Sequence, residues 1–285
     1  MRNLQFILIS CIISLCCHAQ NEFDKYGPFG TEVYTDLKLA IDIGSNVYKI
    51  DLSYQKLEPK VYAKMNKLKG LQALILRDNE VKNYPPNFSD LSNLLYFASF
   101  NNEFTNFPSP LKSLYNLNYI EFFGAKLDSI PEEIGYLSKL KTLKISSTND
   151  TLRLPESLRY LKKLKDLTIE NCVLDSLPTE VFKITNLTFL NLTNTSMFYL
   201  PTSIQTLESL EVLVLDANQL TKIPYQIFKA KKLRFLSVKN NKLQKLPDSI
   251  SQLENLTVLD VRGNPFSKNY IEELKALLTG CEIRY

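Results

Sequence analysis

Cysteine and histidine are the residues that could act as nucleophile, base or metal ligand, and this chain has few of them. It holds five cysteines and one histidine, and His18 lies in an apolar N-terminal segment with three of the cysteines. A Ser-His-Asp or Cys-His arrangement needs a histidine base, and structural zinc sites need clustered cysteine and histidine. With eight glycines, the chain also has no Gly-rich phosphate loop. We therefore expect no catalytic residue, no metal site and no cofactor.

Lysines form the other group that could bind a ligand. Six of them gather around two adjacent segments of the chain: Lys139, Lys141, Lys144, Lys162, Lys163 and Lys165. Such a patch would suit a glycan or another anionic polymer, whereas a solvated flank is the more ordinary interpretation of a charge run. The net charge of the whole chain is +4, which gives no reason to expect nucleic acid as a partner.

A repeat of apolar residues and prolines forms the scaffold that must position these side chains. Prolines recur every 23 residues, with one interval of 24, at Pro85, Pro108, Pro131, Pro155, Pro178, Pro201, Pro224 and Pro247. The cleanest copy starts at Leu210 and continues through Leu213, Leu215 and Asn218 to Pro224. A fixed period of this length is typical of a repeat architecture. Alternating apolar residues in each copy predict a short strand, with its apolar side facing inward.

These motifs resemble leucine-rich repeats, and the 23-residue Leu-Pro form is similar to the Ras-group type. About ten copies cover residues 47–266. The resemblance implies an α/β horseshoe: a parallel concave sheet with short helical turns on the convex side. It also implies a non-catalytic module that binds another protein through the concave face.

The ninth position of each repeat predicts how the loops between strand and turn are held. Asparagine stands there at Asn79, Asn102, Asn218, Asn241 and Asn264, and its side chain can bond the backbone of the neighbouring repeat. The middle departs from the pattern, with Ala125, Thr148, Cys172 and Thr195 in turn. We expect Cys172 to be a buried structural thiol and the centre of the ladder to be looser.

Both ends of the repeat array have the features of caps. Residues 20–46 are predicted to form an N-terminal cap with a short helix over residues 35–43 that stops at Gly44. Residues 267–285 are predicted to form a C-terminal cap, whose helix begins after Ser267 and is followed by a last short strand. We expect no catalytic domain beyond it.

The first 19 residues have the pattern of a secretory signal peptide. Arg2 provides the positive start, an apolar run follows, and Ala19 is the small residue expected before cleavage. We expect a secreted or periplasmic protein that begins at Gln20, and no transmembrane helix, because no later run has 18 apolar residues. An intracellular scaffold is the alternative if the leader is not cleaved.

Aromatic side chains in the third and fourth repeats are the candidate partner-binding site. By alternation, Tyr96 and Phe100 point outward from one strand, and Tyr119, Glu121 and Phe123 from the next. We expect them to form an exposed patch on the concave face, where aromatic residues dominate binding hot spots. The alternative is a strand shifted by one residue, which would turn Tyr96 and Phe100 into the core.

Overall fold

The computed structural model describes residues 23–28, 30–148, 151–174 and 179–285. The predicted signal peptide, residues 1–19, lies outside the described residues, as do Asn149 and Asp150 within the one 24-residue interval.

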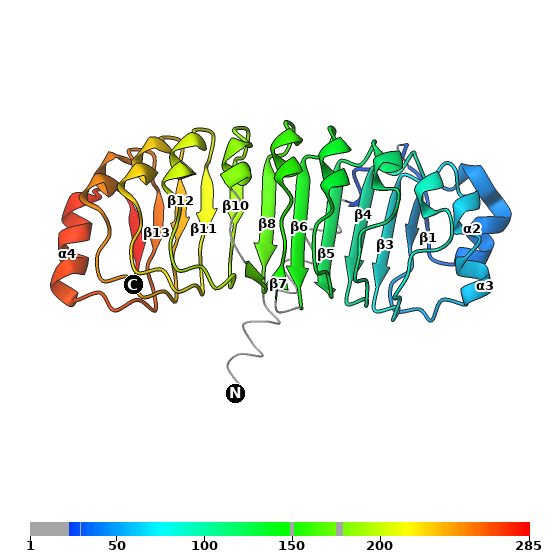
Figure 1. Cartoon of the computed structure of the whole chain (residues 1–285), viewed down its shortest axis with the longest axis horizontal. Coiled ribbons are helices and arrows are strands. Elements are labelled where there is room, and N and C mark those ends of the chain that lie inside the picture. The colour runs from blue at the N-terminus through cyan, green and yellow to red at the C-terminus, as the bar shows by residue number, and fades with distance from the viewer. Residues whose placement is uncertain (1–22, 29, 149–150, 175–178) are drawn as a thin grey trace.

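One parallel sheet runs the length of the molecule, with a strand from each repeat (Figure 1). Its twelve strands follow one another in chain order, apart from two short strands that pair separately. The strands are β1 (Val33–Tyr34), β2 (Lys49–Asp51), β3 (Ala73–Arg77), β4 (Tyr96–Phe100), β5 (Tyr119–Ala125), β6 (Thr142–Ser147), β8 (Asp166–Glu170), β10 (Phe189–Asn191), β11 (Val212–Val214), β12 (Phe235–Ser237), β13 (Val258–Asp260) and β14 (Glu282–Arg284). Equivalent positions of successive repeats therefore lie side by side.

Short helical turns return the chain to the start of the next strand. Five of the 3-10 turns are capped by a repeat proline, whose fixed backbone ends the extended loop: Pro131, Pro155, Pro201, Pro224 and Pro247. The turns are η1 (Gly44–Asn46), η2 (Met65–Lys67), η3 (Phe88–Asp90), η4 (Leu111–Leu114), η5 (Glu132–Tyr136), η6 (Glu156–Tyr160), η7 (Thr179–Lys183), η8 (Thr202–Thr206), η9 (Tyr225–Lys229) and η10 (Asp248–Gln252), with a short helix α3 at Pro59–Tyr62.

The main core lies between the sheet and these turns. Inward residues of neighbouring strands stack in register, as Leu213, Leu236 and Leu259 do, and all three are fully buried. Burying one such side chain stabilises the fold by roughly 2 kcal/mol. Because each repeat adds the same layer to this core, the structure confirms the predicted α/β leucine-rich repeat solenoid.

The asparagine ladder is present in both halves of the molecule. Asn218 Nδ2 donates to the carbonyl of Leu192 at 2.7 Å, while its Oδ1 accepts from the amide N–H of Met197 at 3.0 Å. Asn102 acts in the same way, since its Oδ1 accepts from the N–H of Val81 at 3.1 Å. The predicted bonds between the asparagine side chains and the neighbouring loops are thus confirmed.

In the middle of the molecule, backbone pairing takes the place of asparagine. The two short strands β7 (Thr151–Leu152) and β9 (Val173–Leu174) pair with each other beside the main sheet. The N–H of Ile130 also donates to the carbonyl of Arg153 at 2.9 Å. A small second ladder thus pairs loop backbone in the middle of the molecule, and the Ala125 carbonyl accepts from the N–H and the hydroxyl of Thr148.

Helices lie at both ends of the array (Figure 1). Helix α2 (Leu37–Ile43) starts at Asp36, whose Oδ1 accepts from the N–H of Leu39, and ends at Gly44. Helix α4 (Lys268–Leu277) starts at Ser267, whose Oγ accepts from the N–H of Tyr270 at 3.1 Å. Both helices lie where the capping residues predict them.

Candidate binding surface

The side chains that alternate with the core leucines form rows across the concave face. We call the third position of each repeat the first concave row; the paired strands place its members side by side. Its members are Lys49, Ala73, Tyr96, Tyr119, Thr142, Asp166, Phe189, Val212, Phe235, Val258 and Glu282. This row has two apolar stretches, one in each half of the molecule, separated by polar residues.

The N-terminal stretch has the predicted register. Tyr96 pairs with Tyr119 and Phe100 with Phe123. The rings of Tyr96 and Tyr119 stack with their centroids 4.5 Å apart and their planes 17° apart. Phe97 lies in the main core, on the opposite side of the strand. The alternative strand shift is therefore wrong, and the aromatic side chains face away from the main core as expected.

The prediction that these side chains are exposed is wrong. The exposed fraction is 0% for Tyr96, 3% for Phe100 and 2% for Tyr119, and Phe123 is half-buried. They belong to a second apolar cluster on the concave face, which also contains Phe23, with Tyr26 and Val33 packed against it. The chain's own N-terminal segment thus covers the patch, so these residues are not free for a partner while it stays in place.

Glu121, which pairs with Ala98 of the neighbouring strand, is a buried acid on the same face. Its exposed fraction is 2%, and Tyr119 Oη donates to its Oε2 at 2.5 Å. Burial raises the pKa of the Glu121 carboxyl, while Lys144 nearby acts in the opposite direction. Burial and the Glu121 carboxylate likewise raise the pKa of the Tyr119 hydroxyl. The two side chains therefore form a buried hydrogen-bonded pair.

The lysines of the predicted basic patch divide between two surfaces. Lys144 stands on the concave face, is 8% exposed, and places its Nζ 3.8 Å from Asp166 and 5.7 Å from the centroid of the Tyr119 ring. Its inclusion in an exposed patch is therefore wrong, because it is an outward strand residue enclosed by its neighbours. The other five members are exposed: Lys139, Lys141, Lys162, Lys163 and Lys165.

The C-terminal apolar stretch is a surface that the sequence reasoning missed. Phe189, Val212, Phe235 and Val258 are consecutive in the first concave row, and each is half-buried rather than enclosed. We call these four residues the open row. Val214 adds a further half-buried apolar side chain beside it. Alternation alone would have identified them, but the valines lie next to the core leucines and resemble part of the same apolar run.

Ion pairs border the open row. Lys239 Nζ lies 3.1 Å from Asp216 Oδ2, and Arg262 Nη2 lies 2.5 Å from Asp260 Oδ2. Asp216 Oδ1 also accepts from Ser237 Oγ and from the N–H of Lys239. These charges are paired within the protein, so the surface beside the open row is polar without carrying a large charge of one sign.

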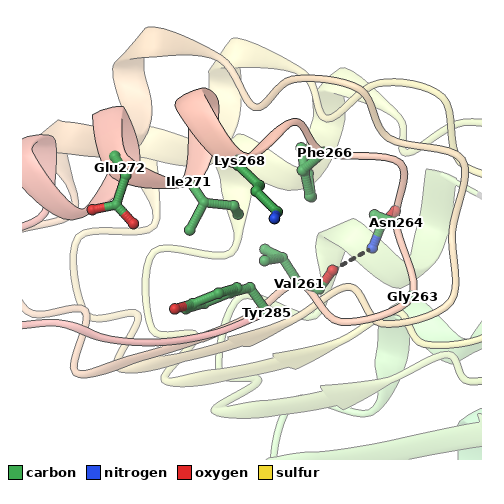
Figure 2. Close-up of a pocket in the computed structure, with 8 residues that line it drawn as sticks. All are labelled: Val261, Gly263, Asn264, Phe266, Lys268, Ile271, Glu272 and Tyr285. Atoms are coloured by element: carbon green, nitrogen blue, oxygen red, sulfur yellow. Dashed lines mark hydrogen bonds between the residues drawn. The ribbon is translucent and has the colours of Figure 1, made fainter.

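A pocket of about 380 Å³ lies at the C-terminal end, beneath helix α4 (Figure 2). Val261, Phe266 and Ile271 form its apolar wall, and Lys268 and Glu272 stand on the helix beside it. Asn264 Nδ2, also at its edge, donates to the carbonyl of Val261 at 3.0 Å. One amine and one carboxylate four residues apart on the same helix are not an arrangement of nucleophile and base.

Within the described ranges, no group of three or more metal-ligating side chains comes together. In the same part of the chain, no helix combines the length and apolarity needed to cross a bilayer.

Comparison with known proteins agrees with this architecture. Residues 178–279 match the family model described as "Leucine-rich repeat region". No curated protein sequence matches the chain.

Three solved structures show the same fold. An internalin (inlF) from Listeria monocytogenes is 20% identical, with a TM-score of 0.70 over 89% of this chain and 73% of its own. The ectodomain of the Arabidopsis thaliana receptor kinase GASSHO1/SCHENGEN3 is 24% identical, with a TM-score of 0.67 over 83% of this chain and 29% of its own. The Arabidopsis receptor kinase HAESA, in complex with the peptide hormone IDA and the co-receptor SERK1, is 27% identical, with a TM-score of 0.64 over 78% and 39%. The chain spans less than half the length of the two plant chains.

The repeat period, the asparagine ladder, the parallel sheet and the matched region all lead to one conclusion: the chain has the leucine-rich repeat fold, and its residues 178–279 match a leucine-rich repeat region.

Proposed function

We propose that the chain is a non-catalytic binding module that holds another protein against its concave face. The observation that carries this proposal is the open row. Four apolar side chains from four adjacent strands are half-buried there without being enclosed. Contiguous apolar surface with a polar border is typical of protein interaction sites, and aromatic residues within it contribute most of the binding energy.

The geometry of the sheet favours an elongated partner segment. Neighbouring strands lie about 4.8 Å apart, so four members of one row form a strip about 15 Å long. Such a strip matches a few residues of an extended peptide or one face of a short helix. The plant receptor HAESA, whose structure was solved with a peptide hormone, supports this choice of partner class.

We further propose that the protein acts outside the cytoplasm. This rests on the pattern of residues 1–19, with Arg2 before the apolar run and Ala19 at its end. Intact mass of the protein from the culture medium and from cell fractions tests it. A chain that begins at Gln20 in the medium or periplasm is expected, and an intact Met1 in the cytoplasmic fraction would favour the intracellular scaffold instead.

The binding proposal is tested by comparing two double variants in a pull-down from extracellular extract. Phe189→Ser with Phe235→Ser removes both rings of the open row, and the captured protein should be lost. Tyr199→Ser with Tyr225→Ser removes two exposed tyrosines of the loops and turns, and capture should persist. Equal capture by both variants would contradict binding at the open row.

Binding of an anionic glycan is the second candidate, favoured by the five exposed lysines Lys139, Lys141, Lys162, Lys163 and Lys165. Lys139 Nζ donates to Asn116 Oδ1 at 2.6 Å and lies 5.8 Å from the centroid of the Tyr115 ring, so part of this charge is already held by neighbours. A glycan bound here would dissociate as salt rises, whereas a protein on the open row would not.

A further inference from the structure

Residues 23–28, which we call the strap, lie over the N-terminal stretch of the first concave row. Phe23 is fully buried and belongs to one apolar cluster with Ala73, Ile75, Tyr96, Ala98, Phe100 and Tyr119. Its ring meets the Tyr96 ring edge-on, with centroids 5.6 Å apart and planes at 70°. Tyr26 also contacts the Tyr96 ring, with centroids 5.3 Å apart. Two aromatic side chains of the strap therefore occupy one aromatic site of the sheet.

The strap holds these two rings on a single turn of backbone. The N–H of Tyr26 donates to the carbonyl of Phe23 at 3.2 Å, which places the rings three residues apart on the same side. Gly27 and Gly30 follow with φ values of 85° and 75°, a left-handed conformation that glycine adopts without strain. Pairing with the sheet starts only later, where Val33 of β1 lies opposite Lys49 of β2. Side chains, rather than a strand ladder, thus hold the turn on the surface.

Burial of the Lys49 ammonium under the strap opposes the packing of the strap on the sheet. The side chain is 6% exposed and makes no ion pair among the described residues; its Nζ donates to the Asp24 carbonyl at 3.0 Å and lies 6.0 Å from the centroid of the Phe23 ring. A buried cation without an ionised partner is unfavourable, because a carbonyl replaces only part of its hydration. Departure of the strap would return this ammonium to water, which offsets part of the apolar contact that is lost.

The surface under the strap does not need the strap to take its shape. Tyr96 and Tyr119 are strand residues in fixed register, they stack on each other, and Tyr119 is held by its hydrogen bond to Glu121. Removal of the turn would leave an aromatic patch beside a cation, which is the composition of a protein recognition site.

We propose that residues 23–26 are an internal ligand of the concave face, and that a partner protein displaces them with a turn of its own that carries two aromatic side chains three residues apart. This inference rests on the proposed function, because it names the partner segment and the step that controls its access. An acidic residue in that turn would pair with Lys49 better than the Asp24 carbonyl does. The partner can bind only to molecules in which the strap has left the site. Its apparent affinity is therefore the intrinsic affinity multiplied by the fraction of molecules with an open site.

A peptide-binding experiment tests the proposal without the natural partner. The probe is a fluorescent peptide of residues 23–28, and the proteins are the whole chain and its variant Phe23→Ser with Tyr26→Ser. We expect the variant to bind the peptide at least about ten-fold more tightly than the unchanged chain, because its own turn no longer competes for the site. The same peptide with both rings replaced by serine should not bind.

Two further variants locate the site and separate this inference from the proposed function. Tyr119→Ser added to the strap variant should abolish peptide binding, whereas Phe189→Ser with Phe235→Ser added to it should leave peptide binding unchanged. The pull-down on the open row reports on the proposed function by itself, so either result can fail alone.

Three outcomes would overturn the proposal. The first is equal peptide binding by the unchanged chain and the strap variant. The second is a strap variant with native circular dichroism that binds neither the peptide nor a hydrophobic dye. The third is a strap variant that no longer folds, because a ligand that can be displaced is not essential to the core.

Discussion

The two halves of the concave face carry the same kind of residue at the same strand positions, yet one is core and the other is surface. Tyr96 and Tyr119 in the N-terminal half are enclosed, whereas Phe189 and Phe235 in the C-terminal half remain partly open. The strands beneath them share one sheet and one register. The difference arises from the strap, which adds a layer over one half only. Side-chain direction is thus set by the strand, and exposure by what packs on the strand from elsewhere.

The largest expected difference is in stability: removal of two rings from the covered half should destabilise the protein more than removal of two rings from the open row. Phe100→Ser with Phe123→Ser removes two rings of the covered cluster. Phe100 is enclosed there, with the Arg77 guanidinium 4.5 Å from its ring, and Phe123 is half-buried. We expect this double variant to lower the free energy of unfolding by about 4 kcal/mol, as buried Phe deletions do. Phe189→Ser with Phe235→Ser should cost about 1 kcal/mol, because part of each ring is already in water. Urea unfolding of both variants measures this; equal losses would mean that the halves are not differently covered.

The asparagine ladder should, in contrast, contribute equally in the two halves. Asn102→Ala and Asn218→Ala each leave buried backbone groups of a neighbouring loop without partners. We expect each to cost about 2 kcal/mol. Asn255→Ala, which removes one exposed bond to the Lys231 carbonyl, is the control and should cost well under 1 kcal/mol. A large gap between the two ladder variants would show that the scaffold itself differs between the halves.

The buried carboxyl of Glu121 should make the covered half sensitive to pH. Because burial raises its pKa, the protonated side chain is favoured in the folded state. That contribution to stability is complete below the ordinary pKa of a glutamate and is lost as pH rises through the raised value. Glu121→Gln imitates the protonated form, so its melting temperature relative to the unchanged protein should rise between pH 4 and pH 8. Glu133→Gln, on an exposed turn, is the control; a Glu121→Gln variant that tracks it at every pH would contradict the expectation.

The smallest effect is expected from the exposed lysines at the junction of the halves. Lys139→Ser, Lys163→Ser and Lys165→Ser together should change the free energy of unfolding by less than about 0.5 kcal/mol. They should also leave binding of a protein partner, and its response to 0.05 and 0.5 M salt, unchanged, because apolar contacts are not screened as charges are. Loss of binding at low salt in this variant would indicate that the partner binds the exposed lysines and not the open row.

Much of this surface follows from the sequence, and its limits have a physical cause. The repeat period predicts the sheet, the loop asparagines and the stacking of Tyr96 on Tyr119, because these depend on neighbours at a fixed spacing. Alternation could also have placed Lys144 on the concave face and identified Val212 and Val258. The burial of Tyr96 could not be predicted in this way, since it depends on a segment in an earlier, non-repetitive part of the chain. The alternation of residues along a strand predicts which way a side chain points. It does not predict whether a segment from elsewhere in the chain covers that side chain.

The strap also changes how the molecule should fold. In a solenoid, repeats contact only their neighbours, so ordering can spread from any point and the ends can open one unit at a time. Phe23 instead contacts Tyr96, in the third repeat, and its contacts can form only after the intervening repeats have assembled. The first four repeats should therefore open together as one cooperative block, with a single protection level in hydrogen exchange, while repeats under the open row release their amides in steps. A short turn of chain thereby converts one half of a quasi-linear molecule into a unit with the cooperativity of a globular domain.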